Sequence, residues 1–317
     1  MSDQIKRDIT NDGIDRRGFL KCMAWVGTGV VWSLSSGGLL TSRALGDPVP
    51  AAEASSDFTF VQVSDSHIGF AKEPNKDVVA TFNRAIEKIN ALPRQPEVLL
   101  HTGDLSHRAV AAEFDTVEQI LKSAKVGERF YVPGEHDVDD ESKLYLDRFG
   151  KNTHGKGWQS FDLRGVHFVG LNNVASTGDE VLGILGQEQL NWLKKDLDGV
   201  KDSTPLVVFA HVPLWSVYPK WGWGTQDAEQ ALALMRRFAA VTVLNGHIHQ
   251  VLQKREGNIK FHTACSTAFP QPQPGTAPSP GPIKSVAAEK LRSMLGLTRV
   301  DFSAKDRMLA VVDDTLD

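Results

Sequence analysis

The segment FVQVSDSH, residues 60–67, joins a short apolar run to two potential metal ligands, Asp65 and His67. Acidic or imidazole side chains follow an apolar run in the same way at four later places in the chain. The four later runs are Val98–Leu100, Phe130–Val132, Leu206–Ala210 and Val241–Leu244. Short apolar runs of this kind predict buried strands, and groups that follow strand ends can converge at one edge of a sheet.

The polar motifs that follow these runs keep one fixed order along the chain. They are Asp65-Ser66-His67, Gly103-Asp104, Gly134-Glu135-His136-Asp137, His211 and Gly246-His247-Ile248-His249. Carboxylates and imidazoles suit Mn, Fe and Zn, and a carboxylate can bridge two ions ~3.5 to 4 Å apart in two-metal hydrolases. A single Asp-x-His or Gly-Asp turn is common, but five of the ten histidines fall within this one ordered set. The set therefore predicts a metal site.

The ordered set resembles the signature of the calcineurin-like metallophosphoesterases: Asp-x-His, Gly-Asp, Gly-Asn-His-Asp/Glu, His and Gly-His-x-His. The resemblance covers about residues 58–270. It implies an α/β fold of two packed mixed β-sheets flanked by helices, a four-layer sandwich. It also implies two divalent metal ions, Mn, Fe or Zn, and hydrolysis of a small phosphate monoester or diester by a hydroxide held between the ions.

Carried over by position, the resemblance implies a metal-binding role for seven side chains. These are Asp65, His67 and His249 for the first ion, Asp104 for the bridge between the ions, and Glu135, His211 and His247 for the second ion. His136 would stand near the substrate as general acid or phosphate-binding group. Asp137 would orient the His136 ring.

Position 135 departs from the family signature, which has Asn there. An Asn carbonyl binds metal while its amide donates a hydrogen bond to the substrate phosphate. Glu135 still offers a metal ligand, but it cannot donate, and it sets a negative charge beside an anionic substrate. A lost hydrogen bond to a charged group costs ~1.5 to 3 kcal/mol, roughly ten- to hundredfold in rate. Two interpretations follow: a conservative ligand exchange in an enzyme, or a metal-binding protein on the same scaffold with weakened or no catalysis.

The N-terminal segment Asp15–Lys21, which reads DRRGFLK, resembles a twin-arginine export signal, and the weakly apolar stretch Cys22–Leu40 follows it. We expect residues 1–54 to be a signal peptide and linker, and residues 55–317 to be the metallophosphoesterase domain. Cleavage would follow Ala44 or Ala54. Passage through the twin-arginine machinery predicts a periplasmic or extracellular location. The apolar stretch is long enough for a retained anchor, but its glycine and serine content favours an export signal, so no stable membrane span is expected in the mature form.

Charge and composition exclude one class of partner. The formal net charge is −4, and residues 1–54 carry six basic and six acidic side chains, so the mature chain keeps the same value. Such a balance offers no basic footprint for nucleic acid. The 263 residues that remain after residue 54 suit one large α/β domain.

Outside the motifs, periodicity predicts further elements of both kinds. Helices are expected at Asp77–Leu92, Gln187–Leu197, Asp227–Phe238 and Ser285–Leu295, a hairpin across Trp158–Leu171 with its turn at Arg164-Gly165, and late strands at Val251–Arg255, Ile259–Thr263 and Met308–Val312. Strands therefore alternate with helices over most of the domain.

Two biased segments lie close to the motifs. Pro270–Pro282 carries six prolines in thirteen residues and predicts an extended surface loop, either a spacer or a wall of the cleft. Four aromatic residues, Trp215, Tyr218, Trp221 and Trp223, follow His211. They indicate either a small satellite core or a rim that stacks on the substrate, in which Trp221 and Trp223 are the candidate binding residues.

The remaining histidines carry weaker signals. His107 lies three residues after Asp104, where related purple acid phosphatases carry a metal-binding tyrosine, and we expect it behind a ligand or at the cleft rim. His101, His154, His167 and His262 have no such motif context and are expected to be structural.

Overall fold

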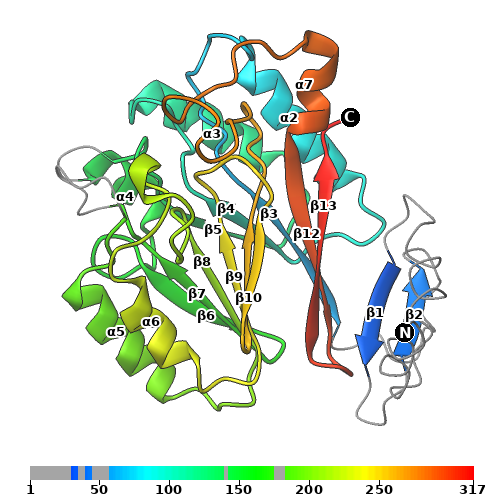
Figure 1. The fold of residues 1–317 in the computed structure, drawn as a ribbon, viewed down its shortest axis with the longest axis vertical. Coiled ribbons are helices and arrows are strands. Elements are labelled where there is room, and N and C mark those ends of the chain that lie inside the picture. Colours follow the sequence, from blue (N-terminus) through cyan, green and yellow to red (C-terminus); the bar gives the residue numbers. More distant parts are fainter. Residues whose placement is uncertain (1–29, 35–39, 45–56, 139–141, 175–182) are drawn as a thin grey trace, which may run out of the picture. The chain divides into compact units, whose positions relative to one another are not determined.

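The computed structural model describes residues 57–138, 142–174 and 183–317, together with the backbone of two strands nearer the N-terminus (Figure 1). By contacts, the chain separates into two units, Met1–Ala54 and Ser55–Asp317. In the first unit, β1 (Val30–Leu34) pairs antiparallel with β2 (Leu40–Ala44). The twin-arginine motif at residues 15–21 lies outside the described residues, so export and signal cleavage stay predictions.

Two sheets form the centre of the unit Ser55–Asp317 (Figure 1). One has the order β13-β12-β3-β4-β5 and the other the order β10-β11-β9-β8-β7-β6. The bounds of the strands are β3 Phe58–Val63, β4 Val98–Thr102, β5 Glu128–Val132, β6 Gln159–Leu163, β7 Val166–Leu171, β8 Leu206–Ala210, β9 Val241–Asn245, β10 Gln253–Glu256, β11 Ile259–Thr263, β12 Gly296–Ser303 and β13 Met308–Thr315. The pairs β3-β4-β5 and β7-β8-β9-β11 are parallel and the others are antiparallel, so both sheets are mixed.

Helices cover the outer faces of the two sheets. They are α2 Val78–Asn90, α3 Ala111–Lys122, α4 Lys143–Phe149, α5 Gln187–Asp198, α6 Ala228–Met235 and α7 Ala288–Met294, with a 3-10 turn η1 at Pro219–Trp221. One apolar cluster joins α2, α3 and α7 to the five-stranded sheet, and another joins α5 and α6 to the six-stranded sheet. Figure 1 shows α5 and α6 side by side along that second sheet. Among the described residues, no helix combines the length and the apolar character that a bilayer crossing requires.

A third apolar cluster fills the space between the sheets, and the alternation of β3 explains how it forms. Side chains of a strand point to opposite faces in turn. Phe58 and Phe60 therefore face the second sheet, where Phe60 meets Phe168 edge to face at 5.2 Å, while Val61 and Val63 pack under the helices. Full burial of each such side chain contributes about 1.5 to 3 kcal/mol. The layers run helix, sheet, sheet, helix, and the predicted fold class is confirmed.

Candidate metal centre

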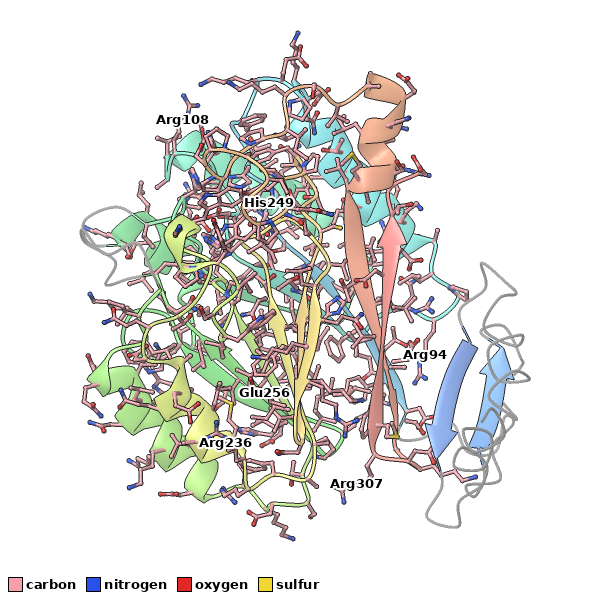
Figure 2. All side chains as sticks on the ribbon, viewed as in Figure 1. Arg94, Arg108, Arg236, His249, Glu256 and Arg307 are labelled. Atoms are coloured by element: carbon pink, nitrogen blue, oxygen red, sulfur yellow. The ribbon has the colours of Figure 1, made fainter. Side chains whose placement is uncertain are left out.

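The motif residues follow the carboxyl ends of β3, β4, β5, β8 and β9. Within each sheet these strands are parallel, so their carboxyl ends share one edge. A hydrogen bond from Gln62 Nε2 on β3 to the Asn245 carbonyl on β9, 3.1 Å long, joins the two edges. In Figure 2, His249 and Arg108 lie at this end of the sheets, whereas Glu256 and Arg307 lie toward the other end. All seven side chains predicted as metal ligands belong to clusters whose nitrogen and oxygen atoms lie within 4.8 Å of one another.

The first cluster joins Asp65, His67 and His249, all of them buried. His67 Nε2 lies 3.3 Å from His249 Nε2, which in turn lies 3.2 Å from Asp65 Oδ1. Burial and the neighbouring imidazoles hold the pKa of His67 well below its usual value. Two imidazole nitrogens and one carboxylate oxygen therefore point at one small volume.

The second cluster joins Glu135, His211 and His247. Glu135 Oε2 lies 2.8 Å from His211 Nε2, and Glu135 Oε1 lies 3.0 Å from His247 Nδ1. Desolvation would raise the pKa of Glu135, but the two imidazoles outweigh it and hold that pKa well below its usual value. Glu135 thus lies within the cluster to which its place in the motif assigned it, with its side chain 39% exposed.

Asp104 lies between the two clusters. Its Oδ2 is 3.4 Å from His67 Nε2 and 3.5 Å from His211 Nε2, while its Oδ1 accepts a hydrogen bond from the His136 amide at 2.9 Å. One carboxylate oxygen therefore faces a histidine of each cluster. Asp104 is therefore a candidate for a ligand shared by both clusters.

Hydrogen bonds of the His211 and His249 rings show that the ring nitrogens facing the site can bind a cation. His211 Nδ1 donates to the Thr102 carbonyl at 2.7 Å, and His249 Nδ1 donates to the Phe269 carbonyl at 2.6 Å. Because a carbonyl only accepts, each Nδ1 carries the hydrogen and each neutral ring turns a lone pair on Nε2 toward the site. The His211 lone pair then faces carboxylate oxygens, an arrangement that requires a cation or a proton between them. Without an ion, burial opposes charging, but Asp104 and Glu135 raise the pKa of His211 well above its usual value.

The backbone of the ligand loops is held in an uncommon conformation. Asp65, His67, Asp104, His247 and His249 all have positive φ, between 42° and 69°. This left-handed region is rare for residues with a side chain, and each such residue costs on the order of 1 kcal/mol or more. The chain therefore turns sharply at each of these positions.

Two motif glycines are required by close packing. A Cβ on Gly246 would lie 2.0 Å from Ser64 Oγ and 2.6 Å from Asp65 Oδ2. A Cβ on Gly134 would lie 2.1 Å from Asp104 Oδ1. Any side chain at either position would displace the carboxylate of a candidate ligand, and this explains why glycine stands at these two motif positions.

His136 lies at the site, but the structure places Asp137 elsewhere than the sequence suggested. His136 Nδ1 donates to the His107 carbonyl at 2.9 Å, so that carbonyl, not Asp137, orients the ring and leaves Nε2 available. The Asp137 carboxylate instead accepts from the amides of Leu105, Ser106 and Gly134 and from the Ser106 hydroxyl. Burial and the charge of Asp104 raise the pKa of Asp137 to about 7, against the effect of those amides. Asp137 therefore ties the loop after β4 to the loop after β5.

A buried carboxylate that sequence reasoning missed, Glu113 on α3, holds the loop that carries His107. Glu113 accepts from the amides of His107 and Arg108, at 3.0 and 2.8 Å, and from Arg108 Nε at 2.7 Å. A Cβ on Gly69 would lie 2.0 Å from Glu113 Oε1, so glycine leaves room for it. Two of its three donors are backbone amides, which leave no mark in the sequence.

His107 itself contacts two motif histidines. Its Nδ1 lies 3.3 Å from Nδ1 of His67, and its ring stacks on that of His136 with centroids 4.7 Å apart. The ring therefore lies behind a predicted ligand and beside the predicted general acid, within the range of positions that the sequence suggested.

The profile of the calcineurin-like phosphoesterases matches residues 58–251. The chain belongs to the calcineurin-like phosphoesterase family. As the motif order predicted, it is a metal-dependent phosphoric ester hydrolase.

Relatives of this phosphoesterase are named as diesterases. A 3′,5′-cyclic-nucleotide phosphodiesterase of Nostoc sp. is 25% identical over 217 residues, covering 67% of this chain and 79% of the relative. A probable glycerophosphodiester phosphodiesterase, GpdQ, of Arcobacter nitrofigilis is 29% identical over 222 residues, covering 65% of this chain and 77% of the relative.

Solved structures share the fold of the phosphoesterase. A dimetal phosphatase from Danio rerio superposes with a TM-score of 0.55 at 14% identity, covering 82% of this chain and 99% of that chain. A purple acid phosphatase from yellow lupin seeds superposes with a TM-score of 0.61 at 14% identity, covering 90% of this chain and 56% of that chain. At this level of identity the likeness concerns the fold alone.

A cavity of about 460 Å³ opens over the candidate metal ligands of the phosphoesterase. Trp221 and Trp223 line it, and both are also buried in a small apolar cluster with Ile248, so the satellite core is present and still borders the site. Pro280 and Pro282 line the cavity as well, so the proline-rich loop is a wall of the cleft and not only a spacer. A second cavity, of about 430 Å³, lies at the amino ends of β4 and β5 and is lined by none of the predicted ligands.

The histidines that were expected to be structural lie outside the metal clusters of the described residues. His101 is buried and bonds Ser66 Oγ at 2.9 Å, and burial lowers its pKa to about 3. His262 Nε2 lies 2.9 Å from Asp313 Oδ1. His154 is exposed beside Trp192. His167 lies between Asp162 on β6 and Asp196 on α5, at 2.8 and 2.9 Å.

Proposed function

We propose that this chain is a binuclear metal-dependent phosphodiesterase that acts on small phosphate diesters. The observation that carries the proposal is the position of Asp104 Oδ2, which faces His67 Nε2 at 3.4 Å and His211 Nε2 at 3.5 Å. Each of these rings belongs to its own cluster of three candidate ligands. Two clusters that share one carboxylate are the arrangement of two-metal hydrolases.

The chain's own residues would divide the work as follows. Asp65, His67 and His249 would hold one divalent ion, Glu135, His211 and His247 the other, and Asp104 would touch both. When bound, such ions polarise the phosphoryl oxygens and lower the pKa of a coordinated water. His136 lines the cavity with Nδ1 committed to the His107 carbonyl, so a proton on Nε2 can pass to the leaving oxygen.

The charge of the cavity favours diesters over monoesters. No Lys or Arg is among the described residues that line it, and the sequences of residues 139–141 and 175–182 contain none. At neutral pH a phosphate monoester carries close to two negative charges, whereas a diester carries one. With Glu135 at the site, the single charge is the easier one to accommodate. The two relatives described above are named for diester substrates, which agrees with this preference.

We also propose that the protein works outside the cytoplasm, on the strength of the Arg16-Arg17 motif and the glycine- and serine-rich apolar stretch after it. Signal-directed export is checked by cell fractionation of the wild-type chain and of the Arg16→Lys, Arg17→Lys double variant. Retention of the double variant in the cytoplasm is expected, and unchanged export would refute the assignment.

The test of the activity uses the full-length protein, stripped of metal and then reloaded with Mn or Fe. Hydrolysis of bis(4-nitrophenyl) phosphate should return with metal, and calorimetry should count two ions per chain. Turnover without metal, or a single ion at full activity, would contradict the proposal. Tight binding of metal without turnover of this diester or of 4-nitrophenyl phosphate would instead indicate the metal-binding protein that Glu135 suggests.

A further inference from the structure

One side of the cavity over the metal clusters is apolar and uncharged. The side chains that form it come from the ends of β7 and β8, from the loop around η1 and from the proline strap, Pro270–Pro282. They are Val174, Val212, Trp221, Trp223, Pro280 and Pro282. The titratable residues that line the cavity are candidate metal ligands or His107 and His136. One end of the cavity therefore suits a phosphoryl group, and the described side chains at the other end are apolar or aromatic, with the uncharged Gln271 beside them.

Hydrogen bonds fix the proline strap to the metal-ligand loop. Gln271 Nε2 donates to the His247 carbonyl at 3.0 Å, and Gln271 Oε1 accepts from the Gly281 amide at 3.1 Å. Gln250 Nε2 donates to the carbonyls of Gln271 and Pro272, at 3.1 and 2.8 Å. A single side chain, that of Gln271, thus ties the far end of the strap to the backbone of a predicted ligand.

The strap also packs against the aromatic side of the cavity. Ala277 contacts the apolar cluster of Trp221, Trp223 and Ile248. A Cβ on Gly275 would lie 3.3 Å from Tyr218 Oη, so the strap approaches that ring closely. Because proline restricts φ, a strap of this composition loses little conformational entropy when it is held in place. The apolar wall is therefore formed before any ligand arrives.

We propose that this wall is a binding subsite for a flat, uncharged ester group of the diester substrate, an aryl or nucleobase-bearing alcohol, and that Gln271 holds it open. The inference rests on the proposed diesterase activity. An inorganic phosphate fills only a small part of 460 Å³, and cavities of this size hold whole small molecules. A glycerol ester would leave the wall without an apolar partner. A flat ring packed against Trp221 and the prolines gains apolar contact area, on the order of tenfold in binding.

Two substrates of equal charge and identical leaving group test the subsite. Metal-loaded wild-type protein should show kcat/KM about tenfold higher for phenyl 4-nitrophenyl phosphate than for methyl 4-nitrophenyl phosphate. Gln271→Ala should bring this ratio close to one. Gln187→Ala, a change of the same residue type at an exposed position of α5, should leave the ratio as in wild type. Pro282→Ala is the second variant if Gln271→Ala does not fold.

Equal kcat/KM for the two diesters in wild type would overturn the subsite while leaving the diesterase intact. If neither diester is hydrolysed, the proposed activity has failed, and binding then decides the subsite separately. Quenching of tryptophan fluorescence should report tighter binding of diphenyl phosphate than of dimethyl phosphate, and Gln271→Ala should abolish the difference. Equal binding of the two phosphates would reject the subsite whether or not turnover is seen.

Discussion

Replacement of Glu135 by glutamine should change which phosphate esters the enzyme accepts. The candidate ligand atoms of Asp104, Glu135 and His136 lie within 4.8 Å of one another, so a phosphoryl group held among them lies roughly 5 Å from the Glu135 carboxylate. At an effective dielectric constant of ~20, two unit charges at ~5 Å interact by about 3 kcal/mol. A monoester dianion has one more negative charge than a diester monoanion. The repulsion of about 3 kcal/mol is therefore the most by which the Glu135 carboxylate can disfavour a monoester relative to a diester. Because the Glu135 side chain is 39% exposed, we expect a tenfold to hundredfold effect.

The assay compares kcat/KM for 4-nitrophenyl phosphate and bis(4-nitrophenyl) phosphate at pH 8 and saturating metal. Wild type should prefer the diester, and Glu135→Gln should shift the ratio toward the monoester by about ten- to hundredfold. Metal titrations should show weaker binding of one ion in the variant, because an amide replaces a carboxylate ligand. Glu188→Gln, on the exposed face of α5, is the matched control. A change of less than about twofold in the ratio would refute the electrostatic reasoning.

Three further changes probe the scaffold of the site and a distant ion pair. Glu113→Gln removes the charge that binds the amides of His107 and Arg108, so urea unfolding should show a loss of about 1.5 to 3 kcal/mol, with kcat reduced. Gly246→Ala forces a Cβ to within 2.0 Å of Ser64 Oγ, so the purified variant should bind less metal by elemental analysis. His167→Gln removes a ring whose pKa two aspartates raise despite its burial. A raised pKa stabilises the folded state fully at pH values below the unfolded-state pKa of ~6.5, and this stabilisation is lost as pH rises through the folded-state pKa. The free energy of unfolding of His167→Gln should therefore differ more from that of wild type at pH 6 than at pH 9.

Stability within ~0.5 kcal/mol of wild type in Glu113→Gln would mean that the loop holds without its carboxylate. Full metal content in Gly246→Ala would mean that the ligand loop can move aside. A difference between wild type and His167→Gln that grows with pH would give the wrong sign for a stabilised imidazolium.

Most of the strands and helices could be predicted from the sequence, because apolar periodicity and turn residues are local features of the chain. The strands β8 and β11 match the predicted ranges to the residue, and the hairpin turns at Arg164-Gly165 as expected. Helix α3 was missed although Phe114, Val117, Ile120 and Leu121 carry helical spacing, so its signal was present in the chain. Strand β12 was also missed, because it joins its sheet through antiparallel pairing with β3, more than two hundred residues away.

The residues of the candidate site also fall into two groups, those that the sequence motifs predict and those whose contacts depend on the folded chain. The candidate metal ligands were predicted from the order of the motifs, and the structure brings them together. Most partners of Asp137 and Glu113 are backbone amides, whose positions depend on the folded loops and not on residue type. The role expected of Asp137 was therefore wrong, and Glu113 was missed altogether.

The left-handed backbone of the ligand loops has a consequence for how the protein responds to metal supply. Five ligands in this conformation together cost on the order of 5 to 15 kcal/mol, which is comparable with the whole stability of a typical domain. An ion that binds only the folded state offsets that cost by mass action, by about 1.4 kcal/mol for each tenfold rise of its free concentration above its dissociation constant. The thermal unfolding temperature then reports the free ion concentration around the protein. A phosphoesterase starved of its ions would open first at the strand ends, and its lifetime against proteases would follow the metal content of its surroundings.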